Sequence, residues 1–282
     1  MSALSRKSIV SGLIGIALFL SACNASGSGS VSGGAVVEAK STQSFAVGEE
    51  VEVTVSTYNG AIEVRGGTGN QVQVEVTKRG GGDTEAASKA DLDSIELSLT
   101  QAGAQVKLIA THKGPIPPNS SASFVVTVPA GSTLSATLDN GAITVNGVKG
   151  AVTATATNGD ITVQGVEKNA ISVKTTNGSL TLGGTGVTGV TGTTSNGNVS
   201  FQGSLAESST DSRLEADNGN ITLTLSADAQ INIDASTANG TLKSDFTIEG
   251  EVAPKSAKGA IGATPVSRVV MRTQNGDVVI KK

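Results

Sequence analysis

The residue types that most often carry out acid–base and nucleophilic chemistry are rare in this chain. The sequence contains one histidine, His112, and one cysteine, Cys23, among 282 residues. A catalytic histidine needs a nucleophile or an orienting partner within reach, and Cys23, at the end of an N-terminal apolar segment, is not available to His112. Because Lys113-Gly114-Pro115 marks a loop, we interpret His112 as a solvated loop side chain. The sequence therefore predicts no catalytic residues and no enzyme activity.

The densest acidic group lies in and just after a charged insertion at residues 80–91. It comprises Asp83, Glu85, Asp91 and Asp93. Calcium sites are built from several carboxylate and carbonyl oxygens, but we interpret these four residues as a solvated loop face. Residues 83–90 are compatible either with one or two helical turns or with a mobile loop. No metal site and no cofactor is predicted.

Two glycine-rich stretches match parts of known ligand-binding motifs. Residues 184–189 spell Gly-x-Gly-x-x-Gly, but a dinucleotide-binding loop leads into a helix, and here Thr and Gly continue a repeat. Residues 66–72 resemble the calcium-binding nonapeptide of β-rolls, with Gln71 at the place of the liganding Asp. Both stretches are predicted to be structural.

Cys23 follows a segment that has the features of a secretion signal. Arg6 and Lys7 precede a twelve-residue apolar run, residues 9–20, which is too short to span a bilayer as a helix. The string Leu20-Ser21-Ala22-Cys23 resembles the bacterial lipobox, in which the cysteine becomes the lipidated first residue of the mature protein. We therefore expect residues 1–22 to be a lipoprotein signal peptide and Cys23 to carry the lipid. The expected location is extracytoplasmic, anchored to the cell membrane or to the outer membrane.

The segment after the signal peptide is predicted to be a tether. Residues 23–40 comprise the lipidated Cys23 and a Gly/Ser-rich stretch without apolar periodicity, which is typical of flexible linkers. Removing residues 1–22 takes away two basic groups and leaves 18 basic against 24 acidic groups, a formal charge of −6. This charge disfavours nucleic acid as a partner.

Aromatic side chains are too few to form a binding platform. The whole sequence has no Trp, one Tyr and five Phe, and Phe124 and Phe201 occupy apolar positions of predicted strands. Surfaces that bind sugars or single-stranded nucleic acid rely on exposed aromatic rings. The composition therefore argues against both classes of ligand.

Any functional site in this chain would be positioned by a repeated structural unit, which is marked by the dipeptide Asn-Gly. Between residues 138 and 246, six copies of this dipeptide recur at a nearly fixed interval, with their asparagines 18, 19, 19, 22 and 21 residues apart. Each dipeptide tolerates positive φ and is predicted to form a turn, and a last copy occurs near the C-terminus. The predicted structural turn residues are Asn140, Gly141, Asn158, Gly159, Asn177, Gly178, Asn196, Gly197, Asn218, Gly219, Asn239, Gly240, Asn275 and Gly276.

Each repeat contains two short strands, which indicates one coil of a β-solenoid. A stretch such as Ile143-Thr144-Val145 alternates apolar and hydroxyl side chains with period two, and a weaker strand precedes the next Asn-Gly. A coil cannot bury its apolar face alone, so neighbouring coils must stack. All six prolines lie outside residues 138–246, as a continuous backbone ladder requires. The asparagines could also form a hydrogen-bonded side-chain ladder.

We expect one all-β domain over residues 41–282, a parallel β-helix-like solenoid with irregular strand-rich caps. Residues 41–129 are predicted to form irregular N-terminal coils or a cap, residues 130–246 the regular repeats, and residues 247–282 a segment that closes the other end. Caps are expected because an open solenoid end exposes unpaired strand edges.

Several short motifs, in their order, resemble a known bacterial family. Residues 128–131 (Val-Pro-Ala-Gly), residues 140–143 (Asn-Gly-Ala-Ile), the coil series, residues 259–262 (Gly-Ala-Ile-Gly) and residues 272–278, with their Asn-Gly-Asp strand, look like the "putative adhesin" domains called DUF4097. The resemblance covers about residues 41–282. It implies an extracytoplasmic β-solenoid, often membrane-tethered, with no established catalytic residues.

Three functional classes remain at this point. The favoured one is a monomeric envelope lipoprotein whose Thr-, Ser- and Asn-rich faces meet an envelope protein or a cell-surface partner, in adhesion, envelope structure or stress sensing. The second is a β-helix enzyme acting on polysaccharide, which would need clustered carboxylates. The third is an ice-binding solenoid, for which the varying coil length argues against regular rows of hydroxyls. The threonines that suggest it are Thr153, Thr155, Thr157, Thr175, Thr176, Thr193 and Thr194.

Overall fold

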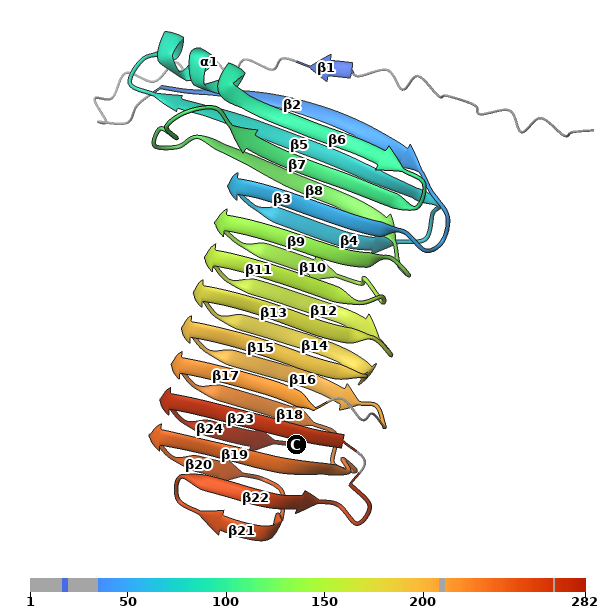
Figure 1. Ribbon diagram of the computed structural model, residues 1–282, viewed down its shortest axis with the longest axis vertical. Helices are drawn as coiled ribbons and strands as arrows, with labels where there is room; N and C mark the ends of the chain where they lie inside the picture. Colours follow the sequence, from blue (N-terminus) through green and yellow to red (C-terminus); the bar gives the residue numbers. More distant parts are fainter. Residues whose placement is uncertain (1–16, 20–34, 208–210, 266) are drawn as a thin grey trace, which may run out of the picture.

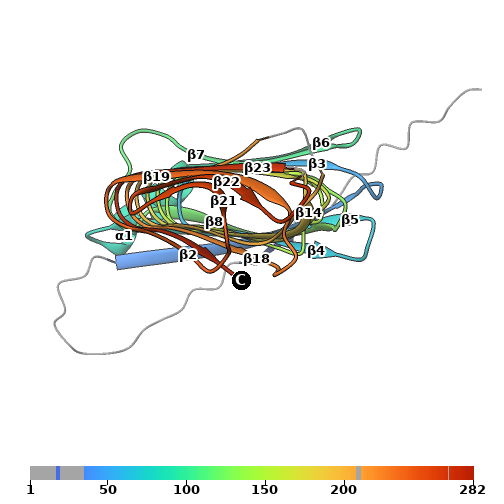
Figure 2. The same ribbon diagram turned by 90° about the horizontal axis from the view of Figure 1, so that it is seen from below.

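The computed structural model describes residues 17–19, 35–207, 211–265 and 267–282. These residues form an elongated stack in which two twelve-stranded sheets face each other (Figure 1). Seen along the stack, the cross-section is flat and wide (Figure 2). The predicted all-β solenoid is therefore confirmed.

Each regular coil contributes one strand to each sheet, and equivalent strands of neighbouring coils pair in parallel. In spatial order the first sheet contains β1 (Ala17–Phe19), β2 (Ala35–Ala46), β5 (Gln71–Gly82), β8 (Ser121–Pro129), β4 (Ile62–Gly67), β10 (Ile143–Asn146), β12 (Ile161–Glu167), β14 (Leu180–Val187), β16 (Val199–Leu205), β18 (Ile221–Leu225), β24 (Val278–Lys281) and β20 (Leu242–Ser244). The second sheet contains β21 (Glu249–Ala253), β22 (Ser256–Ile261), β19 (Ile231–Asn239), β23 (Ser267–Asn275), β17 (Ser212–Asn218), β15 (Gly189–Asn196), β13 (Ala170–Asn177), β11 (Val152–Asn158), β9 (Thr133–Asn140), β3 (Glu52–Asn59), β7 (Gln105–His112) and β6 (Ile95–Ala102).

The core lies between the two sheets and follows from the alternation within each strand. In β10, Ile143 and Val145 are completely buried while Thr144 faces outward. The register places like residues above one another, so that Ile143 pairs with Ile161 and Ile161 with Leu180. The apolar side chains consequently form continuous rows along the stack, and burying them is the main force that holds the coils together.

The order of the coils in space differs from their order in the sequence. The C-terminal pair, β23 and β24, lies between the β17–β18 coil and the β19–β20 coil. The expectation that all of residues 247–282 closes the far end is therefore wrong in part. Only β21 and β22, a hairpin paired antiparallel with β19, cover that end of the second sheet (Figure 1).

The N-terminal end is a wide cap built around an excursion of the chain. The β3–β4 coil stacks directly on the β9–β10 coil, and the intervening residues form β5, α1 (Glu85–Ser94), β6, β7 and β8. Of the two alternatives for the charged insertion, the structure has the helix, whose N-cap Thr84 accepts a hydrogen bond from the Ala87 amide. The predicted tether is too long, because β2 already begins at Ala35 and pairs with β5 along its whole length.

The Asn side chains form a continuous ladder along one edge of the stack. Each amide nitrogen, Nδ2, donates to the Oδ1 of the asparagine in the adjoining coil, at 2.8–3.0 Å. Asn59, which was not among the predicted structural turn residues, belongs to the same ladder. In spatial order the ladder runs Asn59, Asn140, Asn158, Asn177, Asn196, Asn218, Asn275 and Asn239.

The dipeptide is a corner between the sheets and not a two-residue hairpin. The asparagine ends the strand of the second sheet, as Asn177 ends β13, and the strand of the first sheet begins two residues after the glycine. In six of the eight corners, those of Gly60, Gly141, Gly159, Gly178, Gly197 and Gly276, the glycine alone takes positive φ, +156° at Gly178. A Cβ on Gly178 would lie 2.1 Å from the Gly159 carbonyl oxygen of the adjoining coil, so close stacking as well as backbone conformation requires glycine here.

Varying coil length does not disturb the rows of outward-facing hydroxyls. The extra residues lie between a strand of the first sheet and the next strand of the second sheet, as between Leu205 at the end of β16 and Ser212 at the start of β17. The argument that this variation prevents regular rows is therefore wrong. The row on the first sheet comprises Thr144, Thr162, Thr181, Ser200 and Thr222. Two of the threonines considered for ice binding, Thr175 and Thr194, instead face inward and donate to glycine carbonyls of the adjoining coil.

Replacing Gly178 by Val should destabilise the middle of the stack. The β-branched side chain would be forced to positive φ, which costs about 1–3 kcal/mol, and its contact with the Gly159 carbonyl adds to that cost. Thermal unfolding followed by circular dichroism should show a lower melting temperature. The matched control is Thr176→Val, at an outward-facing position of β13, the strand that leads into this corner, for which a change within about 0.5 kcal/mol is expected. Equal melting temperatures for the two variants would contradict this account of the corner.

Candidate functional surfaces

The second sheet presents a flat outer face that carries parallel rows of hydroxyl groups. These side chains are outward-facing members of β3, β9, β11, β13 and β15, held in register by the parallel ladder. One row comprises Thr54, Ser135, Thr153, Ser172 and Thr191, and a second comprises Ser56, Thr137, Thr155, Lys174 and Thr193. Lys174 is the one charged residue in these two rows, so this part of the face is nearly neutral. Neighbouring hydroxyls of a row are about 4.8 Å apart along the stack.

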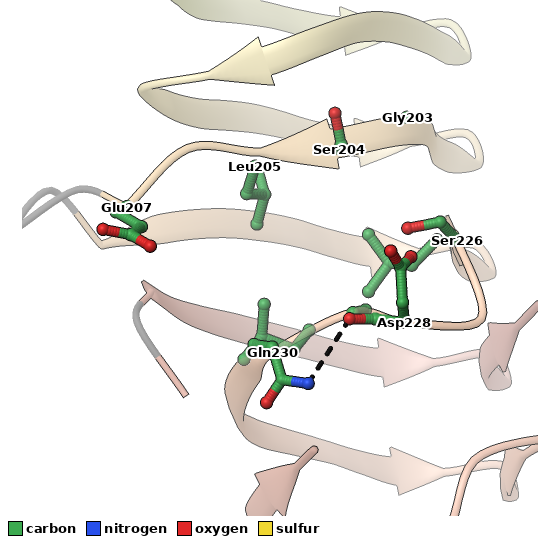
Figure 3. Close-up of a pocket in the computed structure, with 10 residues that line it drawn as sticks. Gly203, Ser204, Leu205, Glu207, Ser226, Asp228 and Gln230 are labelled. Atoms are coloured by element: carbon green, nitrogen blue, oxygen red, sulfur yellow. Dashed lines mark hydrogen bonds between the residues drawn. The ribbon is translucent and has the colours of Figure 1, made fainter. Parts of the chain in front are cut away.

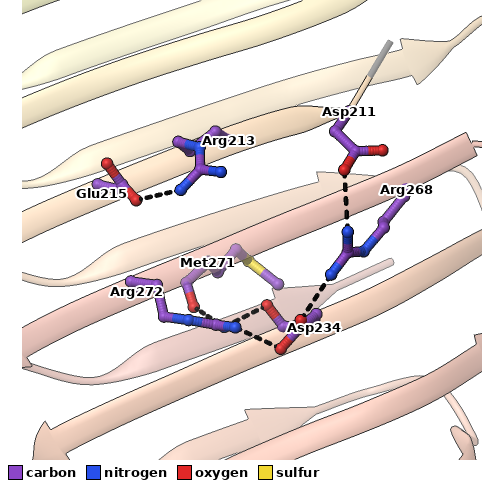
Figure 4. A network of polar contacts seen from close by, with 7 residues as sticks. All are labelled: Asp211, Arg213, Glu215, Asp234, Arg268, Met271 and Arg272. Carbon is purple, nitrogen blue, oxygen red and sulfur yellow. Dashed lines mark hydrogen bonds and ion pairs between the residues drawn. The ribbon is translucent and has the colours of Figure 1, made fainter. Parts of the chain in front are cut away.

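Towards the C-terminal coils, the same face becomes a network of ion pairs (Figure 4). Arg268 on β23 reaches Asp211 at 2.9 Å and Asp234 on β19 at 2.8 Å. Arg272, also on β23, donates to both the carboxylate and the backbone carbonyl of Asp234. Hydrogen bonding to Arg272, aided by Arg268, outweighs the effect of burial and lowers the pKa of Asp234. The network ties the inserted strand β23 to β19 and to the residues before β17.

A buried polar cluster joins the parts of the N-terminal cap. His112 Nε2 lies 2.6 Å from Asp91 Oδ1, and the two side chains are 3% and 4% exposed. The Gly81 amide donates to the other carboxylate oxygen at 2.9 Å, and the Ser120 hydroxyl also bonds to Asp91. Tyr58 meets the His112 ring edge-on, with ring centroids 5.6 Å apart. The interpretation of His112 and Asp91 as solvated loop side chains is therefore wrong.

The order of the groups in this cluster differs from that of a hydrolase triad. In such a triad the histidine lies between the serine and the carboxylate and takes the serine proton. Here Asp91 lies between Ser120 and His112, and the Ser120 hydroxyl instead meets the Tyr58 hydroxyl at 3.2 Å. These contacts fasten three parts of the cap to β3: the helix α1, the strand β7 and the loop before β8. Nothing in the local sequence indicates this cluster, because its members come from four separate segments.

Burial and hydrogen bonding act in opposite directions on the Asp91 carboxyl. Burial raises its pKa, but the hydrogen bonds from the Gly81 amide, the Ser120 hydroxyl and His112 together outweigh burial, so the pKa is lowered. Asp91 therefore stays ionised in the folded protein at neutral pH. The remaining acidic residues of the predicted group do not join it, since Asp83, Glu85 and Asp93 are exposed.

A hollow lies at the edge of the stack, between the ends of β16 and β18 (Figure 3). It encloses about 250 Å³ and is lined by residues 203–205, 225, 226 and 228–231 together with Glu207. Its carboxylates are Glu207 and Asp228, without a histidine or a basic partner among the lining residues. In the part of the chain that the structure describes, no group of three His, Cys, Asp or Glu residues is placed to hold a metal ion.

The two glycine-rich motifs lie in the strand framework. Residues 184–189 span the end of β14 and the start of β15, where a strand follows and not a helix. Residues 66–70 lead from β4 into β5, whose first residue is Gln71. Cys23 lies outside the described residues. No helix among those that are described is long and apolar enough to cross a membrane.

Comparison with known proteins identifies relatives at the level of the family. A family model described as Toastrack DUF4097 matches residues 40–281. No curated protein matches the sequence significantly.

Solved structures of similar fold cover most of the chain at low sequence identity. A putative cell adhesion protein from Clostridium sporogenes ATCC 15579 is 13% identical, with 86% of this chain and 99% of that chain covered and a TM-score of 0.38. A putative adhesin from Bacteroides fragilis NCTC 9343 is 12% identical, with coverage of 86% and 96% and a TM-score of 0.37. A putative lipid binding protein from Parabacteroides distasonis ATCC 8503 is 12% identical, with coverage of 85% and 96% and a TM-score of 0.33.

The Asp91 cluster should make the cap sensitive to acid. Because the pKa of Asp91 is lower in the folded than in the unfolded chain, its stabilising effect is present above about pH 4 and is lost as the pH falls through the folded value. Asp91→Asn should lower stability at pH 7 by about 1–3 kcal/mol, since buried partners lose a charged acceptor. Its stability should also fall less than that of the wild type between pH 5 and 3.

The matched control is Asp83→Asn, at an exposed position of the same insertion. Urea unfolding at pH 7 and across the acid range should show this variant following the wild type. An Asp91→Asn protein with wild-type stability at both ends of the range would show that the cluster does not hold the cap.

Proposed function

Because the chain belongs to the Toastrack DUF4097 family, we propose that it is a non-catalytic interaction module, displayed outside the cytoplasm, that binds an envelope protein through the outer face of its second sheet. The observation that carries this proposal is the pair of in-register hydroxyl rows on β3, β9, β11, β13 and β15.

The physical properties of this face suit protein recognition. Thr and Ser are short side chains that lose little conformational entropy on binding, and each hydroxyl can both donate and accept a hydrogen bond. The parallel ladder fixes their positions before a partner arrives, which reduces the cost of association. A nearly neutral face flanked by the Arg268–Asp234 network also offers charges that can select and orient the partner.

The chemistry of the described residues supports a role in binding over a role in catalysis. The histidine, His112, is buried against Asp91, and the hollow between the ends of β16 and β18 contains two carboxylates without a histidine or a basic side chain. Among the described residues, no group of three His, Cys, Asp or Glu residues is placed to hold a metal ion. Glycosidases place two carboxylates about 5–9.5 Å apart on either side of the bond that they cleave. Ice binding fits less well than protein binding, because Lys174 interrupts one row of the second sheet.

The proposed position at a membrane rests on the N-terminal sequence. A lipidated Cys23 would hold the domain at a bilayer, since more than one acyl chain is needed for stable anchoring. The residues between Cys23 and the start of β2 at Ala35 would then form the tether. Its reach by random-coil scaling is roughly 20 Å, which would allow the stack to project from the lipid surface. Adhesion, envelope structure and stress sensing are all compatible with this arrangement.

Charges placed on the hydroxyl rows should weaken partner capture. The purified domain, residues 24–282, is used to capture proteins from envelope fractions, alongside a variant that combines Thr153→Glu and Thr191→Glu. Both positions are outward-facing, so folding should be unaffected, whereas an unpaired charge in the interface should reduce recovery of the partner about tenfold.

The matched control combines Thr162→Glu and Thr222→Glu, at outward-facing positions of the first sheet. This control should capture the partner as the wild type does. Equal losses in both variants would show that binding does not depend on the second sheet, and the absence of any enriched envelope protein would contradict the proposed function itself.

Replacing Cys23 by Ser should release the protein from membranes or leave the precursor unprocessed. The expectation follows from the need for a thiol to carry the lipid. Cell fractionation with detergent partitioning, together with the mass of the mature N-terminus, measures both outcomes. Ser21→Ala, which keeps the cysteine, serves as the control, and unchanged partitioning of the Cys23→Ser protein would rule out a lipid at this residue.

A further inference from the structure

The sequence contains nine Asn-Gly dipeptides, and each is a place where the chain can modify itself. They begin at Asn59, Asn140, Asn146, Asn158, Asn177, Asn196, Asn218, Asn239 and Asn275. The backbone nitrogen of the glycine can attack the side-chain carbonyl carbon of the asparagine and expel ammonia. Glycine has no side chain to hinder that approach, so the dipeptide alone would make all nine reactive.

Stacking removes this reactivity at eight of the nine places. The glycine N–H in each donates to a backbone carbonyl of the adjoining coil at 2.8–3.0 Å; Gly178, for example, donates to Asn196. A nitrogen held in this way points out of its own coil and cannot turn towards the preceding side chain. The eight protected glycines are Gly60, Gly141, Gly147, Gly159, Gly178, Gly197, Gly219 and Gly276.

Asn239-Gly240 is the exception, because its coil is the last in the Asn ladder. The Gly276 N–H donates to the Asn239 carbonyl, but beyond Gly240 no further Asn-Gly corner follows. Within the described part of the chain, the Gly240 N–H has no hydrogen-bond acceptor, and Asn239 Oδ1 accepts no hydrogen bond. The Asn239 side chain is exposed and is held by one hydrogen bond, from Nδ2 to Asn275 Oδ1 at 2.9 Å.

We propose that Asn239 is a site of spontaneous deamidation, the fastest of the nine Asn-Gly dipeptides in the folded protein. The Gly240 nitrogen forms a bond to the Asn239 side-chain carbonyl carbon and loses its proton, while the carbon–nitrogen bond of the side-chain amide breaks and ammonia leaves. Solvent water then opens the resulting succinimide at either carbonyl. The products are aspartate and isoaspartate at position 239.

The reaction changes the charge and the backbone at the end of the stack. Loss of the amide removes the donor to Asn275, and isoaspartate adds a carbon to the main chain next to the carbonyl that binds the Gly276 amide. The new carboxylate forms one residue after Ala238, whose backbone carbonyl accepts a hydrogen bond from Lys255 Nζ at 2.8 Å. The effect is confined to the last coil, since the ladder from Asn59 to Asn275 keeps its own hydrogen bonds.

The test is a time course of the purified domain at mildly alkaline pH and physiological temperature. Peptide mapping by mass spectrometry, with chromatographic separation of aspartate from isoaspartate, follows all nine dipeptides at once. Position 239 should react at least about tenfold faster than any other Asn-Gly, because the others must first break a backbone hydrogen bond. A rate at position 239 equal to or below that of Asn177 would overturn the proposal.

Two controls separate the effect of the structure from that of the sequence. In concentrated urea the nine dipeptides should react at similar rates, and persistence of the preference for position 239 in the unfolded chain would also overturn the proposal. Asn239→Gln, which keeps an amide but requires a larger ring to close, should abolish the fast phase in the folded domain. A fast phase that remains in this variant would assign it to another residue.

Discussion

The corner at each of the eight Asn-Gly dipeptides of the ladder is the constraint on which the rest of the structure depends. There the backbones of adjoining coils approach so closely that a Cβ on Gly159 would lie 1.8 Å from the Gly141 carbonyl oxygen. At the same corner the asparagine amides bond to one another and, in four coils, a buried threonine donates to a glycine carbonyl of its neighbour. Each coil must repeat the same path at this edge, and the strands on both sides are thereby set in register.

Because the register is fixed at the Asn-Gly edge, the length of the connections at the opposite edge can vary. The loops that return from the first sheet to the second differ in length, and they include the hollow near Asp228. The residue types on the outward faces can also vary, because these side chains contribute little to the core. They change from hydroxyls on β11 to ion pairs on β23 without altering the backbone. A framework of this kind separates the residues needed for folding from those available for recognition.

The unpaired strand edges at the two ends of the stack are covered in different ways. At the N-terminal end, the chain leaves the stack after β4 and returns at β8, with α1 and the Asp91–His112 pair holding the excursion together. At the other end, the final strands β23 and β24 enter the stack, so that the C-terminus is bonded on both sides within the sheets. The β19–β20 coil and the β21–β22 hairpin remain outermost. Those segments carry the open end of the Asn ladder, and the chemistry proposed for Asn239 follows from that position.

The sequence by itself determined the fold class, because the Asn-Gly interval and the Ile-Thr-Val type of alternation together indicate two strands per repeat, which bury their apolar face only when the repeats stack. It also indicated the asparagine ladder. Only the tertiary structure decided which coils are neighbours: the insertion of β23 and the pairing of β3 with β9 depend on non-local packing, and similar repeats carry similar local signals. The same holds for the candidate sites. Asp91 and His112 are 21 residues apart in the sequence, and no periodic pattern in the sequence indicates that they form a buried pair. The hydroxyl rows depend on the strand register, which places Thr153 beside Ser172 and Ser172 beside Thr191.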